Sequence, residues 1–154
     1  MLKLLPFLLA IFLSIFPLFV ETGSTSSPEI PQAVTEEEVR AFLNEYIDAY
    51  VKMDFDRFMA LFSKDAFENR TYLYDDIYKG YGKQFRVSKG LKCEINIFFI
   101  QTYTQSAYVS GRYVMRQKLK GWNPWRVYKG NIQFYLVREN GSLKIKELGY
   151  GIYR

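Results

Sequence analysis

The chain has 154 residues, of which 49% are hydrophobic and 24% are charged, and this length suits a single domain. Basic side chains outnumber acidic ones, 21 to 16, so the formal net charge is +5. The sequence contains no histidine and one cysteine, Cys93, which excludes Ser-His-Asp triads, Cys-His dyads, metal sites built on imidazole and an internal disulfide.

The first twenty residues have the pattern of an export segment. One basic residue, Lys3, precedes a mostly apolar run over residues 4–20, which is barely long enough to span a bilayer. No clear cleavage motif follows, so residues 1–23 are predicted to be either a cleaved signal peptide or an uncleaved membrane anchor. Residues 24–34 are rich in Ser, Thr and Pro, which indicates a flexible spacer. The folded domain is therefore expected over residues 35–154, either periplasmic or tethered to the outer side of the cytoplasmic membrane.

Three helices are predicted at the start of this domain. Thr35 and Glu38 have the spacing of a capping box, and a helical stripe of apolar residues follows them. The stripe consists of Val39, Phe42, Leu43, Tyr46, Ile47, Tyr50 and Val51. Asp54 is suited to cap a second helix, which the polar stretch 63–66 ends. A third helix is predicted over residues 71–85, where an apolar residue recurs every fourth position.

After Gly90 the apolar residues alternate, which predicts four antiparallel strands. These strands cover residues 91–100, 107–116, 126–138 and 143 to about 153. Asn140-Gly141 separates the last two strands and favours a two-residue hairpin turn. Helices followed by strands in this order indicate an α+β domain, with three helices packed on one face of a curved four-stranded antiparallel sheet.

Two segments resemble a known superfamily. EVRAFLNEYIDAYVKMDFDRFMALFSKDAFEN is similar to the opening of the nuclear transport factor 2-like superfamily, whose members are cone-shaped α+β domains, and GNIQFYLVRENGSLKIKEL is similar to the last hairpin of that fold. The combination is also similar to the periplasmic domain appended to some bacterial L,D-transpeptidase and L,D-carboxypeptidase enzymes of cell-wall maturation. The resemblance covers nearly all of residues 35–154 and implies a pocket between the first helix and the sheet. It specifies the fold better than the function, because the superfamily contains enzymes, binding proteins and oligomerisation modules.

Three tyrosines are the predicted ligand-binding residues of that pocket. Tyr46 and Tyr50 lie on the apolar stripe of the first helix, and Tyr113 lies on the inner face of the second strand. Their hydroxyls could hydrogen-bond to a carbonyl or sugar oxygen. The same positions also suit ordinary core residues whose hydroxyls reach the rim.

One acidic residue has the right phase to point into the pocket. Glu147 alternates with Leu143 and Ile145, so it is the predicted inward carboxylate unless a bulge turns it outward. No second carboxylate must share its site, and the lack of histidine departs from the Asp-His pair of the isomerase and dehydratase members. We therefore predict no catalytic residue, with Glu147 as the alternative, and neither a cofactor nor a metal site. Cys93 is predicted to be a buried strand residue.

Charge is divided unequally between the two halves of the domain. Residues 35–78 contain 11 acidic and 5 basic side chains, whereas residues 79–154 contain 15 basic and 3 acidic ones. Cations that alternate with apolar residues on the strands predict a basic outer face on the sheet. They are Lys92, Arg112, Arg116, Lys118, Lys144 and Lys146. Such a face suits an anionic cell wall or membrane surface, or it serves only as a solvated face that discourages edge pairing.

The functional hypothesis is an exported, non-catalytic domain that binds a small molecule, a cell-wall fragment or an envelope protein. The alternative is a small cone-fold isomerase, dehydratase or hydrolase that uses Glu147 with Tyr46 or Tyr113. A third interpretation is an accessory domain that docks an envelope enzyme, because this chain has no cysteine-histidine motif of a transpeptidase. The superfamily resemblance implies dimerisation through the sheet, which the basic face would make salt-dependent. Nucleic acid is not an expected partner of an exported domain.

Overall fold

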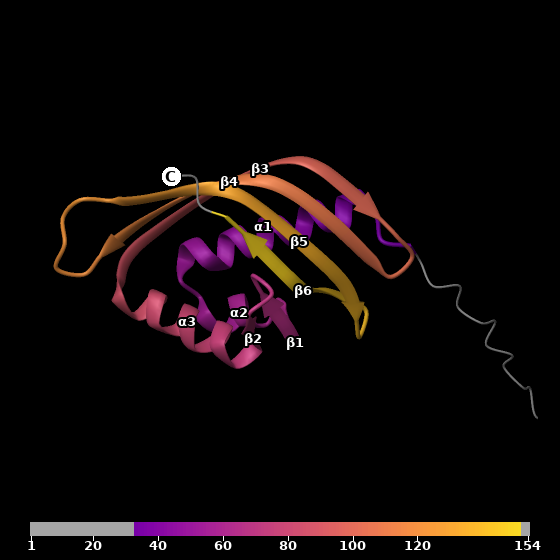
Figure 1. Ribbon diagram of the computed structural model, residues 1–154, viewed down its shortest axis with the longest axis horizontal. Helices are drawn as coiled ribbons and strands as arrows, with labels where there is room; N and C mark the ends of the chain where they lie inside the picture. Colours follow the sequence, from indigo (N-terminus) through magenta and orange to yellow (C-terminus); the bar gives the residue numbers. More distant parts are fainter. Residues whose placement is uncertain (1–32, 152–154) are drawn as a thin grey trace, which may run out of the picture. The chain divides into compact units, whose positions relative to one another are not determined.

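The computed structural model describes residues 33–151 (Figure 1). The predicted export segment and nearly all of the predicted spacer lie outside these residues. Within the described range, no helix is both long enough and apolar enough to cross a membrane.

The helices begin where the sequence places their caps. In the capping box of α1 (Glu36–Lys52), the Glu38 amide donates to the Thr35 hydroxyl over 3.1 Å, and the Thr35 amide donates to the Glu38 carboxylate over 3.0 Å. Met53 ends the helix in a left-handed conformation, with φ of 55°. Asp54 then caps α2 (Phe55–Met59), as predicted, although this helix has only five residues.

The four predicted antiparallel strands are present with similar bounds. They are β3 (Ser88–Thr102), β4 (Ser106–Leu119), β5 (Arg126–Glu139) and β6 (Ser142–Tyr150). Neighbouring strands in this series pair antiparallel. Between β5 and β6, Asn140 and Gly141 have φ of 49° and 80°, and positive φ at both positions is what a two-residue type I′ hairpin requires.

The prediction of a four-stranded, wholly antiparallel sheet is wrong in two respects. The polar stretch that was expected only to end the second helix forms β1 (Phe62–Glu68), and β2 (Tyr72–Leu73) precedes α3 (Tyr74–Val87). The sheet therefore has six strands in the order β2-β1-β6-β5-β4-β3, and β1 runs parallel to β6. The physical reason is that the outer edge of β6 carries unpaired backbone groups, which β1 satisfies although its sequence does not alternate cleanly.

The curved sheet wraps around α1, while α2 and α3 lie below it (Figure 1). Five of the seven residues of the predicted α1 stripe are buried. Ile47 is only partly buried, and at the end of the helix Ala49 is buried while Val51 is exposed. The rings of Tyr46 and Phe134 of β5 pack edge to face, with 5.2 Å between the ring centres. The helical layer therefore packs against the sheet through the buried face of α1.

Two sets of charged groups fix α1 against its neighbours. Both terminal nitrogens of Arg138, on β5, lie 3.0 Å from the Glu38 carboxylate, so the residue that caps α1 also ties it to the sheet. At the other side, the Arg57 guanidinium of α2 donates to Glu45 and Asp48 over 2.7 to 2.8 Å. These bonds lower the carboxyl pKa values of Glu38 and Glu45. The pKa of Asp48 is lowered first by a hydrogen bond from Lys52 and then by the bond from Arg57.

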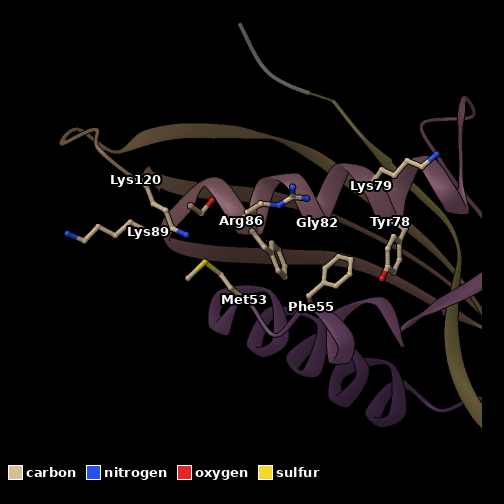
Figure 2. A pocket seen from close by; sticks show the side chains of 10 residues that line it. Met53, Phe55, Tyr78, Lys79, Gly82, Arg86, Lys89 and Lys120 are labelled. Atoms are coloured by element: carbon tan, nitrogen blue, oxygen red, sulfur yellow. The ribbon is translucent and has the colours of Figure 1, made fainter.

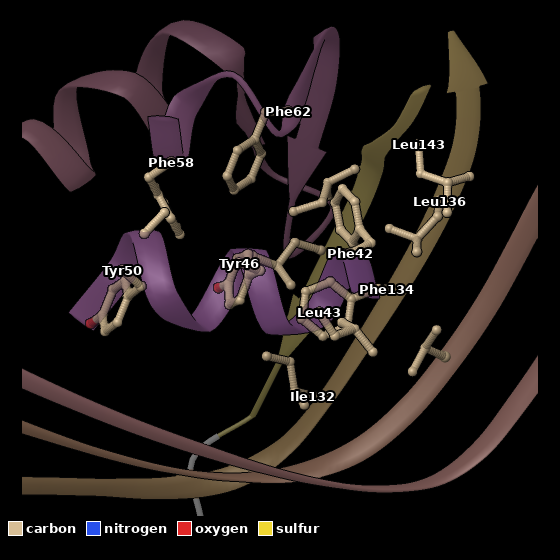
Figure 3. Close-up of a cluster of buried hydrophobic side chains, with 14 of the residues drawn as sticks. Phe42, Leu43, Tyr46, Tyr50, Phe58, Phe62, Ile132, Phe134, Leu136 and Leu143 are labelled. Carbon is tan, nitrogen blue, oxygen red and sulfur yellow. The ribbon is translucent and has the colours of Figure 1, made fainter. Parts of the chain in front are cut away.

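The ring of Phe58 is the centre of the aromatic core (Figure 3). It is fully buried, and its centroid lies between 4.8 and 5.5 Å from five other ring centroids. Those rings belong to Tyr46, Tyr50, Phe62, Tyr81 and Phe85. The short helix α2 therefore joins α1, β1 and α3 through one side chain.

Replacement of this ring should be among the most costly changes in the domain. We expect Phe58→Ala to lower the free energy of unfolding by about 3–5 kcal/mol, because it removes a large apolar side chain and leaves a cavity. Phe98→Ala is the matched control, since the Phe98 side chain is 64% exposed and should change stability by only about 0.5 kcal/mol. Chemical denaturation measures both values. Equal losses would show that Phe58 is not the centre of the core.

Candidate functional site

The hollow of the cone contains a small cavity of about 90 Å³. The three tyrosines predicted from the sequence, Tyr46, Tyr50 and Tyr113, all line it. The rest of its lining consists of Tyr81, Gln84, Cys93, Met115, Ile132 and Tyr150. Sites for drug-sized ligands usually measure roughly 300–1,000 Å³, so this cavity has room for only a small chemical group. The aromatic core fills most of the hollow.

A wider cleft of about 280 Å³ adjoins the cavity. Three side chains line both spaces: Tyr81, Gln84 and Tyr150. The cleft adds Glu68 from the end of β1, together with Asp76, Ile77 and Gly80 from α3. The cavity and the cleft therefore form one candidate site, with a narrow inner part and a wider outer part.

Glu68 is the functional candidate that the sequence analysis missed. Its side chain is only 7% exposed, and the Tyr81 hydroxyl donates to its Oε1 over 2.9 Å. Burial raises the pKa of Glu68, while hydrogen bonds from Tyr81 and Tyr150 act in the opposite direction. Ala66 and Glu68 are both buried two residues apart, a short alternation that would have revealed Glu68 had this segment been recognised as a strand.

The predicted inward orientation of Glu147 is wrong. The pairing of β5 with β6 shifts between Tyr135 and Leu136, so that Lys146 is the extra residue of a bulge. Beyond the bulge, Glu147 pairs with Tyr135, which is 36% exposed, and both side chains lie on the outer side of the sheet. Glu147 is 34% exposed and lies 3.9 Å from Arg70. It therefore cannot act inside the cone.

The tyrosines of the site are neutral hydrogen-bonding groups. Burial raises the pKa of Tyr46, Tyr50 and Tyr81 well above the usual value for a phenol, so their hydroxyls keep their protons at neutral pH. The Tyr50 hydroxyl donates to the sulfur of Met115 and accepts a bond of 2.8 Å from the Gln84 amide. Burial also raises the pKa of Cys93 to about 12, so this thiol is a poor nucleophile.

The six cations predicted for the outer sheet face do not form one patch. Strand register places four of them together across β3 and β4: Lys92, Arg112, Arg116 and Lys118. Of these, Arg116 donates to Glu94 over 2.6 Å. On β6, by contrast, Lys144 donates to the carbonyl of Ala60 and Lys146 pairs with Asp65 of β1. Those two lysines stabilise the contact between β6 and the α2–β1 segment.

The described part of the chain contains no cluster of side chains suited to bind a metal ion. Among residues 33–151, no three Cys, Asp or Glu side chains gather closely enough to hold an ion. The polar groups of the site are the phenol hydroxyls, the Gln84 amide, the buried carboxyl group of Glu68 and the exposed side chain of Asp76.

The sequence matches no protein-family model and no curated protein. The structure is similar to a nuclear transport factor 2-like superfamily protein from Salmonella enterica serovar Typhimurium, with a TM-score of 0.66 and 15% identity over 77% of this chain and 90% of that one. It is also similar to a ketosteroid isomerase-like protein from Erwinia carotovora atroseptica (TM-score 0.62, 16% identity, 79% and 99% of the chains) and to a hexachlorocyclohexane dehydrochlorinase (TM-score 0.60, 9% identity, 77% and 84%). These likenesses show the α+β cone fold of the nuclear transport factor 2-like superfamily, in which enzymes and other proteins occur.

The raised pKa of Glu68 predicts a specific dependence of stability on pH. Above its ordinary value of 4.5, the unfolded chain releases the Glu68 proton while the folded chain retains it, so folding becomes less favourable as pH rises toward the folded pKa. The Glu68→Gln variant lacks this contribution. We expect the unfolding free energy of the parent protein to fall relative to that of the variant as pH increases from 4.5, measured by urea denaturation. A difference that stays constant with pH would contradict the burial of a protonated Glu68.

Proposed function

We propose that this chain is a non-catalytic binding domain of the cell envelope, and that its ligand is a small polar molecule or a wall fragment. The observation that supports this proposal is the continuous lining of the cavity and cleft by Tyr81, Gln84 and Tyr150. These side chains can both donate and accept hydrogen bonds without a change of charge.

The chemistry of the lining favours a ligand with several hydroxyl or amide groups. Phenol hydroxyls and the Gln84 amide match the groups of a sugar or an acetamide, and Glu68 can accept or donate according to its protonation. Aromatic faces cover the apolar side of such a ring. The volume of the cleft suits one ring or one short side chain, and the smaller inner cavity suits a single substituent of that ring.

A cone-fold enzyme is the second candidate function, and the observation that favours it is the environment of Glu68. A buried carboxyl group with a raised pKa, held by a tyrosine in a cleft, is the arrangement that general acid–base catalysis uses. Glu68 therefore replaces Glu147 as the carboxylate of this alternative. We favour binding for two reasons. The Tyr81 hydroxyl already donates a hydrogen bond to the Glu68 carboxyl group, and the inner cavity is too small to enclose a substrate of ordinary size.

The binding proposal can be tested with N-acetylglucosamine and a soluble N-acetylmuramyl peptide as probes. Tyr81→Phe should raise the dissociation constant about fivefold, because it removes one hydrogen bond worth about 1 kcal/mol. Tyr135→Phe is the matched control, since Tyr135 lies on the outer side of the sheet and should leave the affinity unchanged. Titration followed by NMR provides the measurement. Equal affinities for the two variants would show that neither probe binds in the cone.

The same mixtures distinguish binding from catalysis. If the domain only binds, each probe is recovered chemically unchanged after long incubation with the parent protein. Conversion that disappears in Glu68→Gln, with binding retained, would instead establish the enzyme.

We further propose that the domain lies outside the cytoplasm and faces an anionic wall or membrane, or an envelope enzyme, with the four cations of β3 and β4. The charges of this face support the proposal, although Arg116 is paired with Glu94 and the Lys92 ammonium lies over the Trp125 ring. Two copies that met through the sheet would bring these cations together.

Dimerisation through the sheet should therefore depend on salt. Screening weakens repulsion between like charges, so the dimer fraction should rise with ionic strength in sedimentation experiments. The double variant Lys92→Ala/Arg112→Ala should dimerise more readily at low salt, because it removes two of the opposing charges. A dimer of equal strength at low and high salt would exclude this arrangement.

A further inference from the structure

A second concave site lies outside the cone, between the turn that joins α1 to α2 and the outer side of α3 (Figure 2). We call it the outer groove. Its volume is about 810 Å³, within the range of ordinary small-molecule sites. It shares no lining residue with the tyrosine cavity. Its full lining is Met53, Phe55, Tyr78, Lys79, Gly82, Phe85, Arg86, Ser88, Lys89 and Lys120.

The floor of the outer groove is apolar and aromatic. The ring centres of Phe55 and Tyr78 lie 4.7 Å apart, and those of Phe55 and Phe85 lie 6.1 Å apart. Gly82 leaves the Phe55 ring uncovered: a Cβ atom at that position would lie in van der Waals contact with the ring, at 3.4 Å, so a longer side chain there would cover the floor. Tyr78 is 46% exposed. Phe55 is half-buried and Phe85 is buried beneath them, so the floor offers a partly exposed aromatic surface that favours contact with an apolar molecule.

The rim of the groove is wholly cationic. Four basic side chains line it, Lys79, Arg86, Lys89 and Lys120, and no acidic residue does. Within residues 33–151, none of these four side chains forms an ion pair or a hydrogen bond. Their charges therefore remain available to a ligand.

Backbone pairing brings two of these cations to one end of the groove. Leu119 of β4 pairs with Ser88 of β3, and the Lys120 amide donates to the carbonyl of Val87 over 2.9 Å. Lys89 and Lys120 consequently flank the end of α3, as Figure 2 shows. The Ser88 side chain beneath them is buried and accepts a 2.8 Å hydrogen bond from Gln117. The cationic end of the groove is thus supported by an ordered strand junction.

We propose that the outer groove binds one molecule of a single-chain amphiphile with an anionic head group. The apolar chain lies over the aromatic floor, where its burial is favourable, and the head group is held by Lys89, Lys120 and Arg86. The concave shape and the volume favour a single bound molecule over a flat bilayer, which contacts protruding apolar residues. This inference does not rest on the proposed function, because it uses different residues and a different ligand chemistry.

The two tryptophans of the chain provide a direct readout. Trp122 and Trp125 both lie between β4 and β5, in the segment that follows Lys120, so their fluorescence reports on the cationic end of the groove. With the full chain, lysophosphatidylglycerol below its micelle concentration should give a saturable change with one molecule bound. Lysophosphatidylcholine should bind at least about tenfold more weakly, because its head group has no net charge. Inorganic phosphate alone should give no change.

Each alternative result has a definite meaning. Equal binding of the two lysolipids would overturn the role of the cations, and equal binding of free phosphate would overturn the role of the aromatic floor. Binding only to vesicles of phosphatidylglycerol, with none to the monomer, would show that the surface docks on membranes and would reject the single-molecule site.

Variants locate the site. Lys89→Ala/Lys120→Ala should weaken lysophosphatidylglycerol binding by about tenfold, whereas Lys83→Ala/Lys129→Ala, two exposed lysines outside the groove, changes the net charge equally and should have no effect. Gly82→Leu should block the floor. Gly80→Leu is its control on the same helix, because its Cβ meets no atom within 4 Å. Tyr81→Phe should leave the affinity unchanged. The proposal fails if the control pairs weaken binding as much as the groove variants do.

Discussion

The packing of α1 in the hollow of the curved sheet is the constraint on which the rest of the domain depends. Phe58 occupies the centre of this packing, and the rings of Tyr46 and Tyr50 stand between it and the sheet (Figure 3). A cone with smaller residues at these positions would enclose a larger pocket. Here the aromatic rings stabilise the core and reduce the internal space to about 90 Å³. The phenol hydroxyls keep that space polar, because each buried hydroxyl requires a partner.

The position of Glu68 follows from the same packing. Once α1 fills the hollow, the free edge of β6 lies beside the segment that leaves α2, and β1 pairs with it in parallel. This pairing carries Glu68 to the mouth of the cone, next to Tyr81 of α3. A carboxyl group in that place loses much of its hydration, and the Tyr81 hydroxyl replaces part of it. The candidate site is therefore built where two sequence-distant segments, β1 and α3, meet over the open side of the cavity.

Local patterns in the sequence predict a large part of this architecture. The capping box at Thr35, the Asp54 cap and the turn at Asn140-Gly141 are each determined by a few adjacent residues, and all three are present. The three predicted cavity tyrosines follow from helical and strand periodicity. Glu68 was not recognised and Glu147 was assigned wrongly, because the orientation of both depends on distant pairing. The β1 segment becomes a strand only against β6, and a bulge at Lys146 turns Glu147 outward. Periodicity within one segment contains no information about either event.

The ion pairs that form in the folded domain explain where the unequal charges of the two halves of the chain are placed. Several acidic residues of the helical half are neutralised within the molecule: Glu38 by Arg138, Glu45 and Asp48 by Arg57, and Asp65 by Lys146. These pairs use only part of the basic excess of the second half. Most of the cations left over lie in two places, the rim of the outer groove and the outer face of β3 and β4. The cavity in the cone, by contrast, is lined by neutral groups, and two carboxyl groups, those of Glu68 and Asp76, line the cleft at its mouth. The field around the domain therefore attracts anions to its exterior, while the interior is suited to uncharged hydrogen-bonding groups. Because the two regions differ in charge, in volume and in every lining residue, they can select different molecules without competing for the same side chains.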